Sequence, residues 1–170
     1  MAVISNIHKE TMATNNSINI KGPTPLFLAT NFNNQTNVTG DLTAYTVQFT
    51  TSLYDTTSSF NTGTGIFTAP VAGYYSFQCL FLPFGITTQT DYQGYFQTSS
   101  SAFQIASMSE LAGFTISEIT ISGSISCYMN AGDTMEMIFS AGLTPKTISI
   151  SGMTGYGPAP FFSGNLIMAI

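Results

Sequence analysis

Charge is the scarcest property of this sequence. Charged residues make up 6% of its 170 residues, against about 25% in an ordinary soluble domain. Arginine is absent, the only cations are Lys9, Lys21 and Lys146, and the formal net charge is −5. Nucleic acids and anionic membrane surfaces attract clusters of lysine and arginine. We therefore expect neither of them as a partner.

Long apolar runs are absent as well. No stretch approaches the roughly 18 apolar residues that a membrane-spanning helix needs. Residues 1–6 lack the basic segment and following apolar segment of a secretory signal. We therefore expect no membrane insertion and no signal peptide.

Residue types that carry catalysis or bind metals are few. His8 is the only histidine, so a catalytic triad or a zinc site lacks its usual members. Glu118 and Glu136 fall on polar positions of predicted strands, which is typical of solvated side chains. Asp133 lies in a predicted turn, with few acidic neighbours to complete the roughly six oxygen ligands of calcium. We expect no enzyme and no cofactor, and calcium has no support.

The two cysteines, Cys79 and Cys127, each lie in an alternating apolar segment. Buried cysteine behaves as a small hydrophobic residue, which favours two buried thiols. The alternative is a disulfide between neighbouring strands. The sequence leaves both open.

Alternation with a period of two dominates the chain from Leu26 onward. Such alternation is typical of half-buried β-strands, and turn residues separate the segments. Only residues 109–113 suggest a short helical turn. Several short strands without a capped helix predict an all-β sandwich. The clearest strand segments are 45–50, 75–81, 119–129, 135–139 and 148–150, with turns at 39–41, 63–65, 131–133 and 155–158.

The closing segment, 161–170, is apolar on both faces. Such a strand is central in its sheet or is covered by a neighbouring subunit. We take five residues of this segment and of 75–81 as candidates for the core or a trimer interface: Tyr75, Phe77, Phe162, Leu166 and Met168.

The first 22 residues show no sustained period, and a Gly-Pro-Thr-Pro sequence follows at 22–25. We predict an extended N-terminal arm over 1–22 and one domain over 23–170. A frayed terminus is the ordinary interpretation of such a segment. However, a solvated tail has no use for large apolar side chains such as Ile4, Ile18 and Ile20. An anchor on a larger assembly is therefore an equally good interpretation.

Residues 90–96, Thr-Asp-Tyr-Gln-Gly-Tyr-Phe, suggest a loop that contacts a ligand. Asp91, Tyr92 and Tyr95 are the candidate contact residues, because rigid aromatic rings with polar tips can stack on a sugar. The alternative is that the two rings pack on the sandwich or at a subunit seam.

Three ordered motifs resemble the C1q/TNF-like globular head domain, of the kind found in phage and virus surface proteins. They are the segment 38–49, the Phe-Thr-Ala-Pro-x-x-Gly-x-Tyr-x-Phe sequence at 67–77, and Ala-Gly-Asp at 131–133 with Phe-Ser-Gly at 162–164. Gly65 and Gly73 look like turn positions that need freedom in φ. The resemblance implies an antiparallel jelly-roll that forms a homotrimer and binds partners.

Vertebrate members of that family follow a signal peptide and a collagen stalk, and this sequence shows neither. Together with the uncharged polar surface, this resembles a virion protein. We expect a non-enzymatic structural or adhesive protein of the virion surface: a trimeric fibre, knob or decoration of capsid or tail. Its arm would join the larger virion assembly and its head would bind a host glycan or receptor. The alternative is a bacterial or secreted lectin-like C1q-domain binding module.

Overall fold

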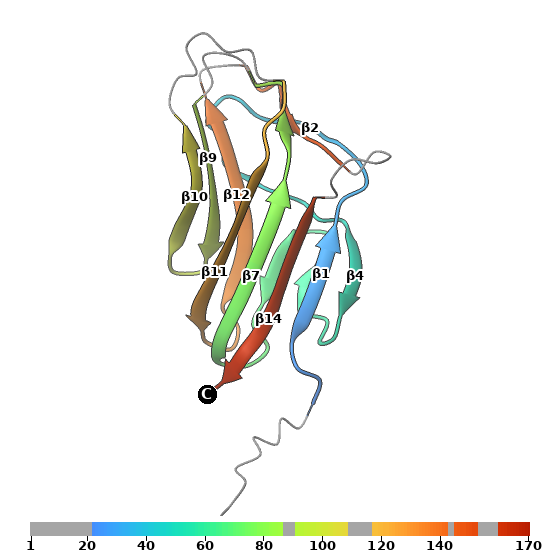
Figure 1. Cartoon of the computed structure of the whole chain (residues 1–170), viewed down its shortest axis with the longest axis vertical. Helices are drawn as coiled ribbons and strands as arrows, with labels where there is room; N and C mark the ends of the chain where they lie inside the picture. The colour runs from blue at the N-terminus through green and yellow to red at the C-terminus, as the bar shows by residue number, and fades with distance from the viewer. Residues whose placement is uncertain (1–21, 87–90, 109–116, 143–144, 153–159) are drawn as a thin grey trace, which may run out of the picture.

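Two antiparallel sheets pack face to face around an aromatic core (Figure 1). The computed structural model describes residues 22–86, 91–108, 117–142, 145–152 and 160–170, and this part of the chain contains no helix. The predicted helical turn at 109–113 and the turn at 155–158 lie outside the described residues. The all-β jelly-roll prediction is confirmed for the described part.

The first sheet has the strand order β11-β7-β14-β1-β4. Its strands are β11 (Ile121–Met129), β7 (Gly73–Phe81), β14 (Phe161–Ala169), β1 (Leu26–Thr30) and β4 (Thr51–Asp55). Strand β14 is therefore central, as its two apolar faces predicted. Strand β14 also holds the segment just before β1, because the Leu166 N–H donates to the Pro25 C=O at 2.9 Å. The segment that leads into β1 and the C-terminus consequently lie at the same end of the sandwich (Figure 1).

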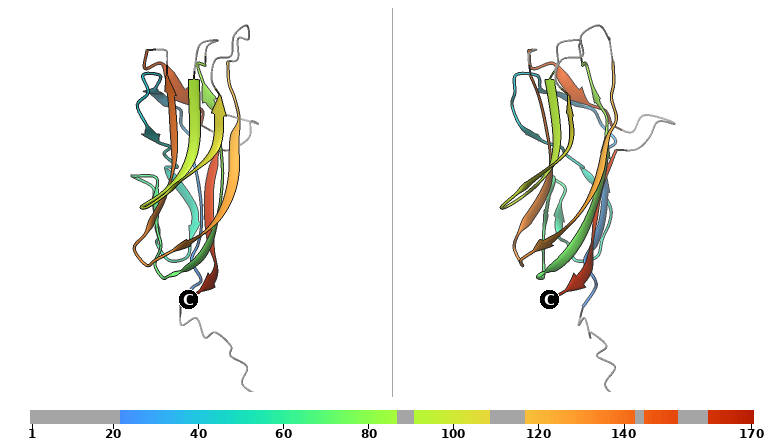
Figure 2. Two further views of the ribbon diagram at one scale, coloured as in Figure 1. Left: turned by 90° about the vertical axis from the view of Figure 1, so that its left-hand side faces the viewer. Right: turned by 60° about the vertical axis from the view of Figure 1, so that its left-hand side comes forward.

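The second sheet has the order β10-β9-β12-β6-β5, and a short three-stranded sheet, β2-β13-β8, accompanies it. The two main sheets form the layers seen in Figure 2. The strands are β10 (Ala102–Met108), β9 (Asp91–Thr98), β12 (Thr134–Gly142), β6 (Ile66–Thr68), β5 (Phe60–Asn61), β3 (Tyr45–Thr46, paired with β12), β2 (Gln35–Thr39), β13 (Ile148–Ile150) and β8 (Pro83–Phe84).

Segment 45–50 departs from its predicted strand. Only its first two residues form a ladder, as β3, although Val47 and Phe49 are fully buried as the alternation requires. At Gln48, the Gln35 side chain takes the place of a neighbouring strand. Its Oε1 accepts the Gln48 backbone N–H at 2.9 Å, and its Nε2 donates to the Gln48 C=O at 2.9 Å. A side-chain amide thus satisfies the backbone groups that a neighbouring strand would otherwise pair.

The core is a cluster of phenylalanine rings from both sheets. Phe27 of β1 stacks on Phe60 and Phe67 of the opposite sheet, with ring centroids 4.8 Å and 5.1 Å apart. Phe162 of β14 meets Phe27 edge to face at 5.0 Å. All four rings are buried. Such pairs add about 0.5–1.5 kcal/mol each beyond the area that they bury.

Gly164 makes room for this cluster on the inner face of β14. A Cβ at this position would lie 2.5 Å from Cδ1 of Phe77 and 2.7 Å from Cε1 of Phe27. These rings are fully buried and fill the space beside the strand. The glycine of the Phe-Ser-Gly motif is therefore required by the close approach of two rings.

The two glycines predicted to need freedom in φ differ. Gly65 has a φ of +75°, which favours glycine. Gly73 does not lie in the left-handed region; it begins β7 beside a bulge in β14. A Cβ there would lie 2.4 Å from the Met168 carbonyl oxygen. The requirement at Gly73 is space, and the expectation of a turn there is wrong.

Cys79 and Cys127 are free thiols. The register places Cys79 opposite Gly123, and Cys127 opposite Tyr75, so the two cysteines are four residues apart along β7 and β11. At about 3.4 Å per residue, this exceeds the separation that a disulfide bridges. Burial raises the pKa of the Cys79 thiol to about 12 and also raises the pKa of Cys127.

We expect Gly164→Ala to lower the free energy of unfolding by about 1–3 kcal/mol, because overpacking forces the neighbouring rings to shift. Ser163→Ala is the matched control, since Ser163 is the next residue on the same strand and is half-buried on its outer face. Chemical denaturation at one protein concentration measures both. Equal stability of the two variants would contradict the role given to Gly164.

We expect Cys79 to resist thiol reagents at pH 8 in the folded protein, because only the thiolate reacts and the raised pKa keeps it scarce. Denaturant should expose it to rapid modification. The pKa of a cysteine thiol is about 8.5 in an unfolded chain and about 12 for folded Cys79. The contribution of this thiol to the free energy of unfolding is therefore fully present below pH 8.5 and is lost as the pH rises toward 12. In a Cys127→Ser variant, any labelling comes from Cys79. Rapid labelling of this variant in its folded state would refute the burial of Cys79.

Candidate interaction surface

Four of the five candidate core or interface residues are buried within the single subunit. Tyr75, Phe77 and Phe162 are fully buried, and Leu166 is 6% exposed. Within this chain they belong to the core. Met168 differs, because 49% of it is exposed.

A bulge in β14 explains the position of Met168. Leu166 pairs with Tyr75, whereas Met168 pairs with Tyr74, so Ile167 is an extra residue in the ladder. The extra residue reverses the alternation, and Met168 faces outward although Leu166 faces the core. Of the two predicted places, Met168 therefore does not occupy the core of this chain, and its place at a trimer interface stays a prediction.

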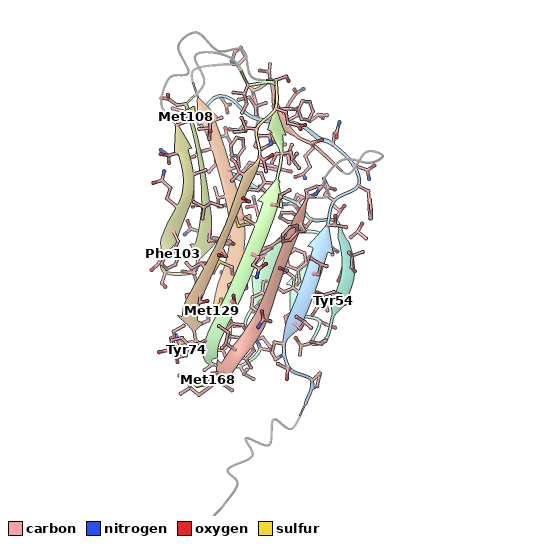
Figure 3. All side chains as sticks on the ribbon, viewed as in Figure 1. Tyr54, Tyr74, Phe103, Met108, Met129 and Met168 are labelled. Atoms are coloured by element: carbon pink, nitrogen blue, oxygen red, sulfur yellow. The ribbon has the colours of Figure 1, made fainter. Side chains whose placement is uncertain are left out.

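The bulge completes an exposed row of large apolar residues, which we call the aromatic row: Tyr128 of β11, Tyr74 of β7 and Met168 of β14. Tyr128 pairs with Tyr74, and Tyr74 pairs with Met168, across adjacent strands. The two tyrosine rings meet edge to face at 5.6 Å. Figure 3 shows Tyr74 and Met168 at the end of the sheet where the chain ends.

Most of the other side chains on the outer side of β7, β11 and β14 are small and polar, while Leu80 and Phe161 form an apolar pair away from the row. No charged residue occurs anywhere in β7, β11 or β14. Aromatic residues and methionine are enriched at the centres of protein–protein interfaces, from which charges are depleted. The face therefore has the composition of an interaction surface. Its outward polar residues include Ser76 and Gln78 of β7, Ser122, Ser124 and Ser126 of β11, and Ser163 and Asn165 of β14.

Tyr74 and Tyr128 were not among the residues selected from the sequence. Each adjoins a residue of the predicted apolar face, Tyr75 or Met129, and so falls on the polar side of its strand. An aromatic residue at a polar position of an amphipathic strand is the signal that identifies them. Pairing between the strands, which the sequence does not give, was needed to place them side by side.

The segment of Asp91, Tyr92 and Tyr95 is a strand, β9, where we had expected a loop. Tyr92 is 8% exposed and points into the core beside Phe139. Tyr95 has the opposite parity and lies half-buried on the outer face of the second sheet. The three residues thus do not form one contact site, because alternation sends the two tyrosines to opposite faces.

The acidic residues have structural partners or lie exposed. The Asn130 backbone N–H donates to Asp133 Oδ2 at 2.8 Å and lowers the pKa of that carboxyl. Glu136 accepts the Thr46 hydroxyl at 2.7 Å, and Glu118 is exposed. The described residues contain no group of three or more potential metal ligands.

The candidate anchor residues Ile4, Ile18 and Ile20, together with His8, lie outside the described residues. The described part of the chain also contains no helix of sufficient length and hydropathy to cross a membrane.

Comparison with known proteins identifies relatives of this fold. The family model described as the C1q domain matches residues 27–156. No curated protein matches the sequence. Among solved structures, the globular domain of zebrafish complement 1qA protein is similar at 17% identity and a TM-score of 0.53, over 87% of this chain and 100% of that one.

Two tumour-necrosis-factor-type structures are similar as well. Murine APRIL at pH 8.0 has 10% identity and a TM-score of 0.55, over 85% of this chain and 100% of its own. The Eiger TNF from S. frugiperda has 11% identity and a TM-score of 0.56, over 87% of this chain and 95% of its own. At these identities the likeness concerns the fold alone.

Proposed function

Because the chain belongs to the C1q domain family, as the match over residues 27–156 shows, we propose that it is a non-enzymatic module that works as a homotrimer on the surface of a virus particle. Domains of the C1q and TNF families typically form trimers. The observation that carries the assembly is the aromatic row on an uncharged sheet face.

The aromatic row supplies the apolar contact for three copies around one axis. Tyr74, Tyr128 and Met168 are 42%, 45% and 49% exposed in the single chain, and burying such side chains stabilises association by about 25 cal/mol per Å² of apolar area. The small serine side chains beside the row allow close approach of a second copy. Cyclic symmetry gives every subunit the same contacts and closes the assembly.

The arrangement of the chain ends supports attachment through the arm. The beginning of the described chain lies at the same end of the sandwich as the C-terminus (Figure 1), and Tyr74 and Met168 lie at that end as well (Figure 3). An arm that precedes Gly22 would reach a particle at this end and direct the opposite end of the trimer outward. The scarcity of charge supports exposure on a shell, because such a surface has little electrostatic attraction for other macromolecules.

Adhesion is the second part of the proposed role. The outward head would bind a host glycan or receptor. The second candidate function is a bacterial or secreted lectin-like C1q-domain module, with which the C1q family match is equally compatible. The two candidates differ in the arm: a virion protein needs it for assembly, whereas a free lectin binds its ligand without it.

We expect light scattering to give the mass of a trimer at micromolar concentration. Tyr74→Ser should weaken association at least tenfold, because a central tyrosine of an interface is worth about 2 kcal/mol or more. Tyr54→Ser is the control: Tyr54 is 46% exposed on β4 of the same sheet and lies outside the row (Figure 3). A wild-type monomer, or equal effects of the two substitutions, would argue against this trimer.

We expect a chain that starts at Pro23 to fold and trimerise but to be absent from assembled particles. The described core contains its aromatic cluster without residues 1–21, whereas the arm would supply the attachment. Quantitative mass spectrometry of purified particles, with the full-length protein as the reference, measures occupancy. Full occupancy by the shortened chain would refute the anchor.

A further inference from the structure

The outer face of the second sheet contains a hollow surrounded by amide side chains and one aromatic ring. Its volume is about 340 Å³. We call this surface the glutamine platform. It is lined by Gln93, Tyr95 and Gln97 of β9 and by Ala102 and Gln104 of β10.

Strand pairing fixes the geometry of the glutamine platform. Gln93, Tyr95 and Gln97 alternate along β9, so that all three side chains project from one face. Gln104 lies directly opposite Tyr95, and Ala102 lies opposite Gln97. The small Ala102 side chain leaves the space that the longer side chains surround. The aromatic ring therefore has amide groups along its own strand and across from it.

A buried apolar residue lies beside the Tyr95 ring. Ile138 of β12 pairs with Tyr95 on one side and with Thr46 on the other. It is 8% exposed although it lies on the outer face of the sheet. Directly opposite side chains on a sheet face have Cβ atoms about 4.5–5.5 Å apart. Tyr95 thus stands against an apolar neighbour on a rigid strand, which limits the entropy that its ring would lose on binding.

The amide groups keep hydrogen-bonding capacity for a ligand. Gln97 Nε2 donates to Thr98 C=O at 3.0 Å, which leaves its Oε1 as an acceptor. Gln104 Nε2 is 3.5 Å from Ala106 C=O, at the outer limit of a hydrogen bond. A glutamine amide offers two donor hydrogens and an acceptor oxygen. The platform therefore presents both donors and acceptors around one half-buried ring.

The charge of the surroundings selects a neutral ligand. The lining residues are uncharged, and the nearest charged group in the register is Glu136, which pairs with Gln97. In the described part of the chain, Lys146 is the only cation, and it lies outside this hollow. An anionic ligand would meet a carboxylate without a compensating cation. A neutral sugar ring offers an apolar face for Tyr95 and hydroxyl groups for the amides.

We propose that the glutamine platform binds a neutral glycan, with one sugar ring on Tyr95 and its hydroxyl groups on Gln93, Gln97 and Gln104. This inference rests on the proposed adhesive function and gives it a site and a ligand class. The platform belongs to the sheet opposite to the aromatic row. Trimerisation through that row leaves the platform accessible three times per assembly.

A glycan array probed with the full-length protein tests the ligand class. We expect binding to neutral oligosaccharides of glucose, galactose, mannose or N-acetylglucosamine, and no preference for sialylated or sulfated ones. Titration calorimetry with the best neutral oligosaccharide then tests the site. Binding only to charged glycans, or to none at millimolar concentration, would overturn the proposal.

Three variants locate the ligand. Tyr95→Ala should weaken binding at least tenfold, Tyr95→Phe should retain most of the affinity because the ring remains, and Ala102→Phe should abolish binding by filling the hollow. Tyr54→Ala is the control for loss of an exposed tyrosine on the other sheet. Unchanged affinity of folded Tyr95→Ala and Ala102→Phe variants would show that the glycan binds elsewhere and would refute the site.

The design separates this inference from the proposed function. Thermal unfolding and light scattering accompany every variant, so that misfolding or dissociation is recognised. A trimer that enters particles but binds no neutral glycan overturns the platform alone. A protein that binds the glycan through Tyr95 but is monomeric or absent from particles overturns the virion role and leaves the platform standing.

Discussion

The contact between phenylalanine rings across the two sheets is the constraint on which the rest of the fold depends. Phe27 joins β1 to β5 and β6 through Phe60 and Phe67, and Phe162 joins the same cluster from β14. The rings set the distance between the layers, and Gly164 exists because two of them occupy its side-chain space. With the core fixed in this way, each strand has one outer face that is free for other tasks.

The two outer faces have different chemistry because their strands differ in regularity. In β14 the extra residue Ile167 turns Met168 outward, and the aromatic row results. Strand β9 pairs with β12 without a shift from Asp91 to Thr98, so Gln93, Tyr95 and Gln97 stay on one side. An irregular strand thus provides the apolar face that we assign to a second copy, and a regular one provides the polar face that we assign to a small ligand.

Sequence reasoning recovers what depends on alternation and misses what depends on single local events. The buried face of β7 follows from the period of two, and so does the central place of β14 from its two apolar faces. The bulge at Ile167 leaves no trace in the pattern, because every neighbour is apolar. The segment 90–96 is a predicted loop, yet from Asp91 onward it forms β9, where a Cβ on Gly94 would meet Ile121 at 3.2 Å. Glycine marks close packing as readily as a turn, and only the facing strand distinguishes the two.

The uncharged character of β7, β11 and β14 has a consequence for the environments in which the protein can persist. Dissolved ions screen attractions between exposed charged groups, and at 0.1 M salt they largely remove those that act over more than about 10 Å. The surface that we assign to assembly has no such attractions to lose, since its contacts are apolar and small polar ones. Its cohesion is therefore largely independent of ionic strength, and fresh water and brine become nearly equivalent surroundings for the assembled protein.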